Sequence, residues 1–367
     1  MVNRKYDASN KLNEEIPYSF ASKKIKSFQS KDAIEQHDRR SVRYHYTSSG
    51  ALMAILNTKN KGNGAVRFTD SRYMNDRSEH MYFVKRLLEF MEKARIKYPF
   101  CQEVINELLL KEHSPEDYIS LKVAEIDVPN PEEAGAASRN NAVSRILSRL
   151  KSRHFLFCLC NDSDSLHMWN YYVHNGNYQG YNIGIRIYDF LKAFDYDDNK
   201  EHDPIRFFCG DVLYKPREQE KEIEELCRTI EHFDETNNST DDDETPLELG
   251  MITLWLYIQS YGLFFKDASF SDEKEYRIVI QYNVFDNKDP FVTNVSSNLS
   301  NVEYTFFERN GILVPCLMVP LSKDAVRQIT LAPILESYIA SSSMREFMES
   351  NGYSGVDVKQ STIPIRY

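Results

Sequence analysis

The segment His154-Phe155-Leu156-Phe157-Cys158-Leu159-Cys160 is a nearly continuous apolar run of β-forming residues. A strand that is apolar on both sides is typical of the interior of a sheet, where both faces are covered by other parts of the protein. The run therefore predicts a central strand. The segments on either side of it are interpreted as the rest of the same sheet and its helices.

Shorter β-rich runs and segments with helical spacing alternate along the rest of the chain. The predicted strands are 43–47, 65–69, 180–187, 205–214, 275–280, 311–319 and 326–332. Apolar residues recur at helical spacing within 77–151, 217–233, 247–265 and 337–350. Strands separated by helical insertions predict an α+β fold with a mixed sheet, rather than a doubly wound one.

The domain organisation follows from where this patterning stops. Residues 1–41 are polar and rich in Lys and Ser, which predicts a loosely ordered N-terminal arm. We expect residues 42–367 to form a single α+β domain with a helical insertion at about 77–151. The acidic stretch at about 234–246 has no apolar anchor and is interpreted as a solvated loop.

Composition excludes some functional classes. The chain has 367 residues, of which 41% are hydrophobic and 27% charged, so a sizeable core is available. With 45 basic and 55 acidic residues the net charge is −10. This balance argues against a protein coated in positive potential for nucleic acid, and leaves only a local basic groove.

The cysteines and the apolar segments indicate a cytoplasmic protein that does not enter a membrane. The six cysteines lack the spacing of a disulfide framework, and no apolar segment follows Met1. The most apolar run, Leu247 to Phe265, contains Glu248, Gln259 and Ser260, and is interpreted as a buried helix.

Most well-known catalytic and metal-binding motifs are missing from the sequence. It has no G-x-x-x-x-G-K-S/T loop, no G-x-G-x-x-G loop and no G-x-S-x-G elbow. Structural zinc requires paired cysteine knuckles, which are also missing, so no metal is expected. Cys158 and Cys160 fall on one side of a strand, where a free cysteine packs as a small hydrophobic residue.

What remains is a set of polar or amphipathic residues inside well-patterned elements. His45 lies in a β-rich run between two tyrosines, Asn75 lies in a turn, and Glu275 begins a strand. Each alone has an ordinary structural explanation: a hydrogen-bonded strand histidine, an Asx-turn and a charged strand end. Taken together with Trp169, they are expected to converge on one concave surface.

Several segments, taken in their order and spacing, resemble a large bacterial family of uncharacterised proteins. They are Tyr44–Ser48, Arg67–Thr69 with Asn75-Asp76, Phe157–Leu159, Met168-Trp169-x-x-Tyr172, Glu273–Arg277 and Ser361-x-Ile363-Pro364-x-Arg366. The layout is more remotely similar to ADP-ribosyltransferases, including the DNA-modifying toxins of toxin–antitoxin systems. The resemblance implies an ADP-ribosyltransferase-like fold and an NAD-consuming enzyme, acting as a toxin or a phage-defence effector.

The resemblance also implies roles for particular residues. In these enzymes an early strand carries His or Arg, the following helix starts with Ser or Thr, and a late strand begins with the catalytic Glu. The corresponding residues here are His45, Thr47 or Ser48, and Glu275. Tyr46 stands where many members have Gly. NAD is the implied substrate, and the acceptor of ADP-ribose, nucleic acid or protein, stays open.

The residue types suit this chemistry. Cleavage of the N-glycosidic bond of NAD develops positive charge on the ribose, which a carboxylate such as Glu275 stabilises. His45 is expected to bind the ribose, and Arg277 to hold Glu275 ionised by an ion pair. Aromatic rings stack on nicotinamide. The predicted cofactor-binding residues are Tyr46, Thr47, Ser48, Tyr73, Asn75, Trp169 and Arg277.

Two other functions remain open from the sequence. The first is a metal-dependent nuclease that uses Asp272, Glu273 and Glu275 with Lys274, and it requires a further carboxylate from another strand. The second is a non-catalytic module that binds a ligand or a partner protein. An activity that depends on a divalent metal would identify the nuclease. Binding of a ligand without its turnover would identify the non-catalytic module.

Overall fold

The computed structural model confirms an α+β protein whose sheet is mixed and largely antiparallel. The residues it describes are 25–28, 38–58, 64–74, 79–110, 151–173, 179–193, 205–236, 245–284, 301–335 and 337–365. The chain divides into two compact units. We call residues 1–27, 75–152 and 213–268 the helical unit, and residues 28–74, 153–212 and 269–367 the sheet unit.

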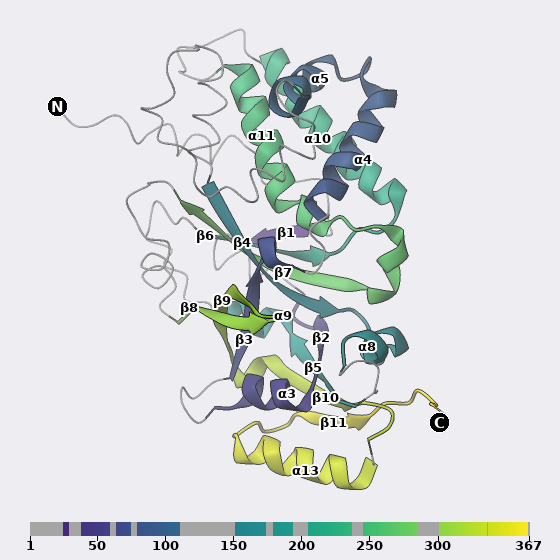
Figure 1. Ribbon diagram of the computed structural model, residues 1–367, viewed down its shortest axis with the longest axis vertical. Coiled ribbons are helices and arrows are strands. Elements are labelled where there is room, and N and C mark those ends of the chain that lie inside the picture. Colours follow the sequence, from purple (N-terminus) through teal and green to yellow (C-terminus); the bar gives the residue numbers. More distant parts are fainter. Residues whose placement is uncertain are drawn as a thin grey trace, which may run out of the picture. The chain divides into compact units, whose positions relative to one another are not determined.

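The helical unit is a group of packed helices (Figure 1). They are α4 (Glu79–Ala94), α5 (Pro99–Ile105), the π-helical turn η3 (Asn106–Leu110), α10 (Pro216–Thr236), α11 (Pro246–Ser260) and the 3₁₀ turn η5 (Gly262–Phe264). Helix α11 starts with a capping box between Thr245 and Glu248 and has Pro246 in its first turn. Its residues from Gly250 to Ser260, except Gln259, are buried, which confirms the buried helix expected from the apolar run.

Residues far apart in sequence meet in this unit. The buried Gln219 of α10 accepts a hydrogen bond from the Tyr82 hydroxyl of α4 at 3.3 Å. Its Nε2 donates to the carbonyls of Leu213 and Lys266 at 2.7 and 3.0 Å. The predicted 77–151 insertion therefore contributes α4 and α5 to a unit shared with 216–264, while residues 111–150 and most of the acidic stretch, 237–244, lie outside the described residues.

The sheet unit is built around the predicted central strand, β4 (Lys151–Cys160). The strands pair in the order β6-β7-β4-β2-β5-β10-β11, while β3 joins β4 to β9 and β9 pairs with β8. Their bounds are β2 (Val42–Thr47), β3 (Gly64–Asp70), β5 (Tyr181–Arg186), β6 (Ile205–Asp211), β7 (Glu275–Val284), β8 (Glu303–Arg309), β9 (Ile312–Leu321), β10 (Val326–Leu331) and β11 (Asp357–Gln360). A further strand, β1 (Ile25–Phe28), spans the boundary between the two units.

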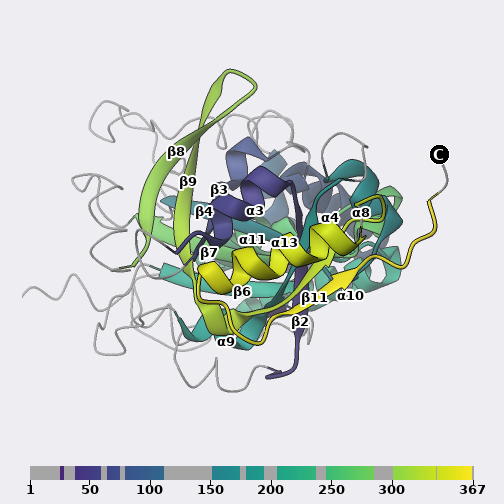
Figure 2. The ribbon, with the colours of Figure 1, turned by 90° about the horizontal axis from the view of Figure 1, so that it is seen from below.

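Short helices connect these strands. They are α3 (Ser49–Leu56), η2 (Ser71–Tyr73), α8 (Leu166–Tyr171), α9 (Ile187–Lys192), η6 (Ala268–Glu273), η7 (Lys323–Ala325) and α13 (Ser337–Ser350). Figure 2 shows α13 beside β11, which pairs with β10 in parallel, and β8 and β9 as a long curved ribbon. The β10–β11 pair makes the sheet mixed, since the neighbouring pairs β2–β5, β5–β10, β6–β7 and β3–β9 are antiparallel.

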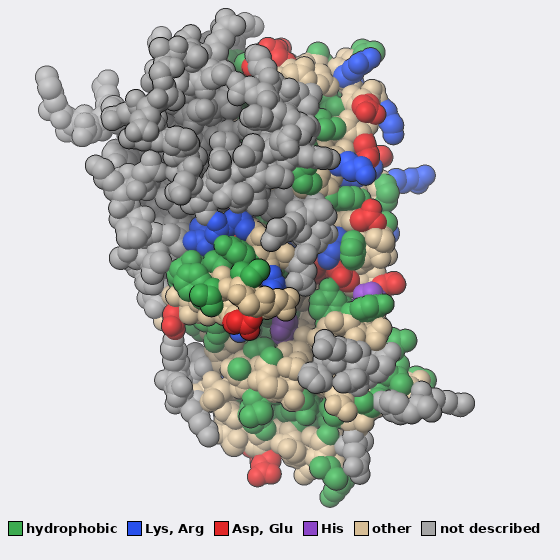
Figure 3. Space-filling view, in the orientation of Figure 1, with side chains coloured by type: hydrophobic (Ala, Val, Ile, Leu, Met, Phe, Trp, Pro, Cys, Tyr) green, Lys and Arg blue, Asp and Glu red, His purple; other side chains and the backbone are tan. Residues whose placement is uncertain are grey.

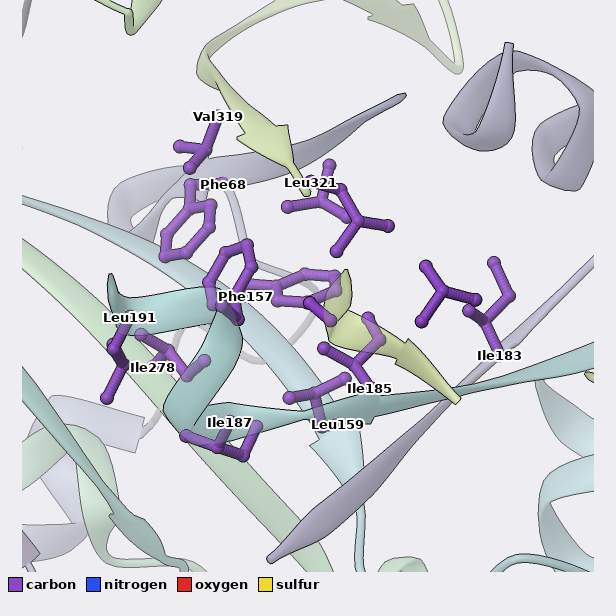
Figure 4. Packing of buried hydrophobic residues seen from close by; sticks show 14 of the residues in the cluster. Phe68, Phe157, Leu159, Ile183, Ile185, Ile187, Leu191, Ile278, Val319 and Leu321 are labelled. Carbon is purple, nitrogen blue, oxygen red and sulfur yellow. The ribbon is translucent and has the colours of Figure 1, made fainter. Parts of the chain in front are cut away.

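Two clusters of buried side chains lie on opposite faces of the sheet around β4. The larger cluster contains Phe157 and Leu159 of β4, with Ile183 and Ile278 from nearby strands (Figure 4). We call this side the core face. The smaller cluster contains Tyr46, Cys160, Met168, Trp169, Val173 and Ala332. We call this side the α8 face, because α8 covers it.

The six cysteines all lie in the described part of the chain and are thiols rather than disulfides, as expected. Among the described helices, none is long and apolar enough to cross a membrane.

Packing around β4 predicts where the sheet unit is most sensitive. The Phe157 ring contacts Phe68 and Phe190 at centroid distances of 5.4 and 6.2 Å. Phe157→Ala leaves a cavity among these rings, so we expect the free energy of unfolding to fall by about 3 to 5 kcal/mol. Leu313→Ala, at an exposed position on β9, serves as the control and is expected to change it by less than about 0.5 kcal/mol. Urea denaturation of both variants checks this, and equal effects would contradict the assignment of the core.

Candidate functional site

A polar network occupies the α8 face where β4 ends. After Cys160 the chain turns through 161–165 and enters α8, whose N-cap is Ser165. The Ser165 hydroxyl accepts a hydrogen bond from the backbone N–H of Met168, which satisfies one of the open donors at the helix start. The turn thereby places two carboxylates, Asp162 and Asp164, at the edge of the smaller cluster.

Asp164 links α8 to the C-terminal segment, which is distant in sequence. Its Oδ1 accepts from the Trp169 indole nitrogen at 2.7 Å and from the Ser361 hydroxyl at 2.6 Å. Its Oδ2 accepts from the backbone N–H of Thr362 at 2.8 Å. Trp169 is fully buried, so its N–H needs this acceptor. Asp164 therefore fastens the C-terminal segment to α8.

Tyr46 holds the other side of the same turn. Its hydroxyl donates to the Asp162 carbonyl at 2.9 Å and accepts from the Ser165 backbone N–H at 2.8 Å. The ring packs edge-on against Trp169, with centroids 4.7 Å apart. Burial raises the pKa of Tyr46 far above its usual value, so the hydroxyl stays protonated and able to donate. A tyrosine at this position therefore shapes the turn, a role that a glycine does not provide.

Two buried carboxylates lie at the start of β7. Glu275 is the first residue of the strand, and its Oε2 accepts from the Arg277 guanidinium at 2.8 Å. Only 8% of Glu275 is exposed, and Arg277 is fully buried. Glu273, also buried, accepts a 2.7 Å hydrogen bond from the Tyr172 hydroxyl. Burial raises the pKa of Tyr172, and the nearby Glu273 and Glu275 raise it further, so Tyr172 is a neutral donor.

Lys274, between the two glutamates, has a left-handed backbone with φ of 45°. This conformation is uncommon for a residue other than glycine. Its carbonyl accepts from the Asn161 N–H at 2.9 Å, and its Nζ pairs with Asp162 at 2.9 Å, which raises the pKa of the amine. Glu273 therefore belongs to η6 rather than to the strand, and the Lys274 turn, not strand alternation, sets its position relative to Glu275.

His45 lies on the opposite face from Glu275. Its ring is 5.0 Å from the Phe157 ring on the core face, and its Nδ1 is 3.4 Å from the Cys158 carbonyl. Burial lowers the pKa of His45 to about 4, against a weaker opposing effect of that carbonyl. The prediction that His45 and Glu275 lie on one concave surface is therefore wrong. The reason is the two-residue period of a strand, which puts Tyr44 and Tyr46, not His45, on the α8 face.

The face of Glu275 follows from the same period on β7. Tyr276, Ile278 and Ile280 belong to the core cluster, so Glu275 and Arg277, which alternate with them, lie on the α8 face. Of the predicted site residues, Tyr46, Trp169, Glu275 and Arg277 therefore share one face of the sheet.

The remaining predicted residues have other places. Thr47 is buried at the end of β2, paired with Tyr181 of β5, and Ser48 caps α3 by accepting from the Ala51 N–H at 3.3 Å. Tyr73 lies in η2 after β3, where its carbonyl accepts from the Arg309 guanidinium. Asn75 lies outside the described residues.

Sequence reasoning did not assign roles to Asp162, Asp164 and Tyr172. The polar turn Asn161–Ser165 directly after an apolar strand was the available signal for the two aspartates. Tyr172 belongs to the Met168-Trp169-x-x-Tyr172 spacing, where the two aromatic residues stand three positions apart on α8 and its cap. Among the described residues, no three or more His, Cys, Asp or Glu side chains are grouped to hold a metal ion.

One family model matches the chain. It is described as a protein of unknown function (DUF2971), and it covers residues 168–278. The match includes Trp169, Tyr172 and the Glu273–Arg277 segment, and it is consistent with the resemblance to a large uncharacterised family. No curated protein and no solved structure matches the chain.

The lowered pKa of His45 makes stability depend on pH. Because its pKa is lowered from 6.5 to about 4, the unfolded chain binds a proton between these values that the folded chain does not. The contribution of neutral His45 is therefore present above pH 6.5 and is lost as the pH falls towards 4. We expect the free energy of unfolding of the wild type, relative to His45→Phe, to fall by about 2 kcal/mol from pH 7 to pH 5. Urea denaturation of both proteins at pH 7 and pH 5 measures this. The same difference in the free energy of unfolding at both pH values would contradict the prediction.

Asp164 is expected to be the most costly polar residue of the turn to replace. Asp164→Ala leaves the buried Trp169 N–H without its acceptor and releases the C-terminal segment, so we expect a loss of about 2 to 4 kcal/mol. Combining it with Trp169→Phe should cost less than the sum of the two changes, by about 1 kcal/mol. The control, Asp357→Ala, breaks an exposed ion pair with Lys359 and should cost below about 0.5 kcal/mol. Thermal melting of the wild type, Asp164→Ala, Trp169→Phe and the double variant measures this coupling, and additive losses would rule it out.

Proposed function

We propose that this protein binds NAD and cleaves its N-glycosidic bond, passing ADP-ribose to water or to an acceptor. The observation that carries the proposal is the buried Glu275–Arg277 ion pair at the start of a strand beside β4. Part of the layout expected from the resemblance to ADP-ribosyltransferases also supports it, while His45 lies on the other face of the sheet. Helix α3, capped by Ser48, directly follows β2, a late strand begins with Glu275, and both strands neighbour β4.

Energetics favour a functional reason for this ion pair. Removing two charges from water costs several kcal/mol per ion, and the attraction between them often does no more than offset that cost. A hydrophobic pair of similar volume would stabilise the strand as well or better. Ionisable groups kept buried under these conditions are concentrated at functional sites.

In the proposed reaction Glu275 supplies the negative charge. The bond from ribose to nicotinamide breaks with its electron pair leaving on the nicotinamide nitrogen, and positive charge develops on the ribose. A carboxylate fixed in surroundings of low dielectric stabilises that charge more strongly than water does. Arg277 keeps Glu275 ionised, because an adjacent cation favours the charged form of a carboxyl group.

Glu273 and Tyr172 complete the proposed centre. The Tyr172 hydroxyl donates to Glu273, and nearly half of Tyr172 is exposed, so its ring offers an aromatic surface beside the carboxylates. Such a ring suits stacking on nicotinamide. Tyr172 takes the place that Tyr73 has in the sequence-based hypothesis, and His45 supports the sheet from the core face.

Replacing Glu275 tests the proposal. Glu275→Gln keeps the shape of the side chain and removes its charge, so we expect nicotinamide release to fall by about a hundredfold or more, with NAD affinity little changed. Glu303→Gln, at an exposed position on β8, is the control and should keep full activity. The measurements are nicotinamide release, NAD binding by calorimetry and thermal melting of the same samples.

A double variant separates catalysis from folding. Glu275→Gln leaves the Arg277 charge buried without its partner, so the single variant is expected to melt lower. Glu275→Gln combined with Arg277→Met removes both charges, and should recover the melting temperature without recovering turnover. An active double variant contradicts the mechanism. A wild-type protein that binds NAD without releasing nicotinamide identifies the non-catalytic module instead.

A further inference from the structure

A second polar centre lies at the other end of β4, around the buried Asp70. This carboxylate accepts from Arg72 through Nε at 2.9 Å and through a terminal nitrogen at 2.7 Å. Arg153 donates to the same carboxylate, with distances of 3.2 and 2.5 Å. Burial alone would raise the pKa of Asp70, but the two arginines lower it below its usual value. Two guanidinium groups therefore share the Asp70 carboxylate.

The two arginines remain within reach of solvent. Their side chains are 21% and 13% exposed, whereas that of Asp70 is fully buried. Arg153 also approaches Tyr304 of β8, with its two terminal nitrogens 3.5 and 3.4 Å from the hydroxyl. Charge and hydrogen-bond donors are therefore gathered at a surface where an anion can approach.

Aromatic side chains continue from this centre along β8. Tyr304 and Phe306 are two residues apart on one face of the strand, and their rings meet edge to face with centroids 5.3 Å apart. Phe306 is 54% exposed, so its ring is accessible to a ligand from solvent. In Figure 3 hydrophobic side chains gather where β8 and β9 lie, bordered by Lys and Arg side chains. Glu308, next on the same face, turns its carboxylate to the backbone N–H of Gly311 at the hairpin turn.

We propose that Arg72, Arg153, Tyr304 and Phe306 form a binding site for nucleotides. The arginines take a phosphate group and Phe306 stacks on a base, a combination typical of proteins that bind single-stranded nucleic acid. The ligand is either a free nucleotide or one unit of a single strand, since both present a phosphate beside a flat ring. This site does not depend on the proposed NAD chemistry. Asp70 pairs with Phe155 near the beginning of β4, on the core face, whereas Glu275 lies on the α8 face near its end.

Arg67 provides a matched control on the same part of the sheet. It is exposed and lies over the Phe307 ring at 3.9 Å. It alternates with the buried Val66 and Phe68, so it lies on the opposite face of β3 from Asp70. Arg67→Gln and Arg72→Gln therefore remove the same charge from opposite faces.

The test is fluorescence anisotropy of a labelled ten-nucleotide oligothymidylate with the full chain. We expect Phe306→Ala and Arg72→Gln each to weaken binding about tenfold, in line with the loss of one stacked base or one phosphate contact. Arg67→Gln should change it less than about twofold. Phe306 is exposed, so its variant is expected to fold normally, and thermal melting of all three variants checks this.

Competition by unlabelled thymidine monophosphate identifies the source of the ligand. Displacement at concentrations similar to those of the oligonucleotide indicates a free nucleotide, and displacement only by the oligonucleotide indicates a single strand. No binding by the wild type, or equal loss in Arg67→Gln and Arg72→Gln, overturns the site. Glu275→Gln should bind the oligonucleotide as the wild type does, so failure of the NAD proposal leaves this result interpretable.

Discussion

The strict alternation of side chains along β4 is the constraint on which the sheet unit depends. Neighbouring strands on both sides pair with β4. The pairing register therefore fixes which face of the sheet each of their side chains occupies. Phe155, Phe157 and Leu159 enter the large apolar cluster, and Cys160 enters the smaller cluster under α8. If β7 were shifted by one residue in its pairing, its side chains would exchange faces. Glu275 and Arg277 would then be buried in the large apolar cluster. The polar network can exist only because the opposite face carries the hydrophobic burial.

Much of the fold was predictable from the sequence, because it follows from local patterns. The apolar run of β4 indicates a strand covered on both sides, and the capped apolar helix α11 is buried in the structure. Strand order and pairing depend on long-range contacts that one sequence does not display. The grouping of α4 and α5 with α10 and α11 is an example, since the Tyr82–Gln219 hydrogen bond joins residues 137 positions apart.

The candidate site was only partly predictable. Trp169, Tyr46, Glu275 and Arg277 do lie on one face, but a histidine between two tyrosines gives no sign of which ring faces which side. Tyr44 pairs with Cys160, and the Tyr46 ring contacts Trp169, so both tyrosines lie on the α8 face. His45, between them, therefore lies on the core face. The position of Glu273 could not be predicted either, because it depends on the left-handed backbone of Lys274. A lysine rarely adopts this conformation.

The two polar centres differ in how their buried charges are compensated. Glu275 and Arg277 pair one carboxylate with one guanidinium group, and in the proposed reaction this fixed carboxylate stabilises the positive charge that develops on the ribose. Asp70 is shared by two arginines, and in the proposed nucleotide site these guanidinium groups also donate to a phosphate group. Because the two centres lie at opposite ends and on opposite faces of β4, a ligand at one does not touch the other. The two centres share β4 as a neighbouring strand, since β3 carries Asp70, β7 carries Glu275, and both pair with β4.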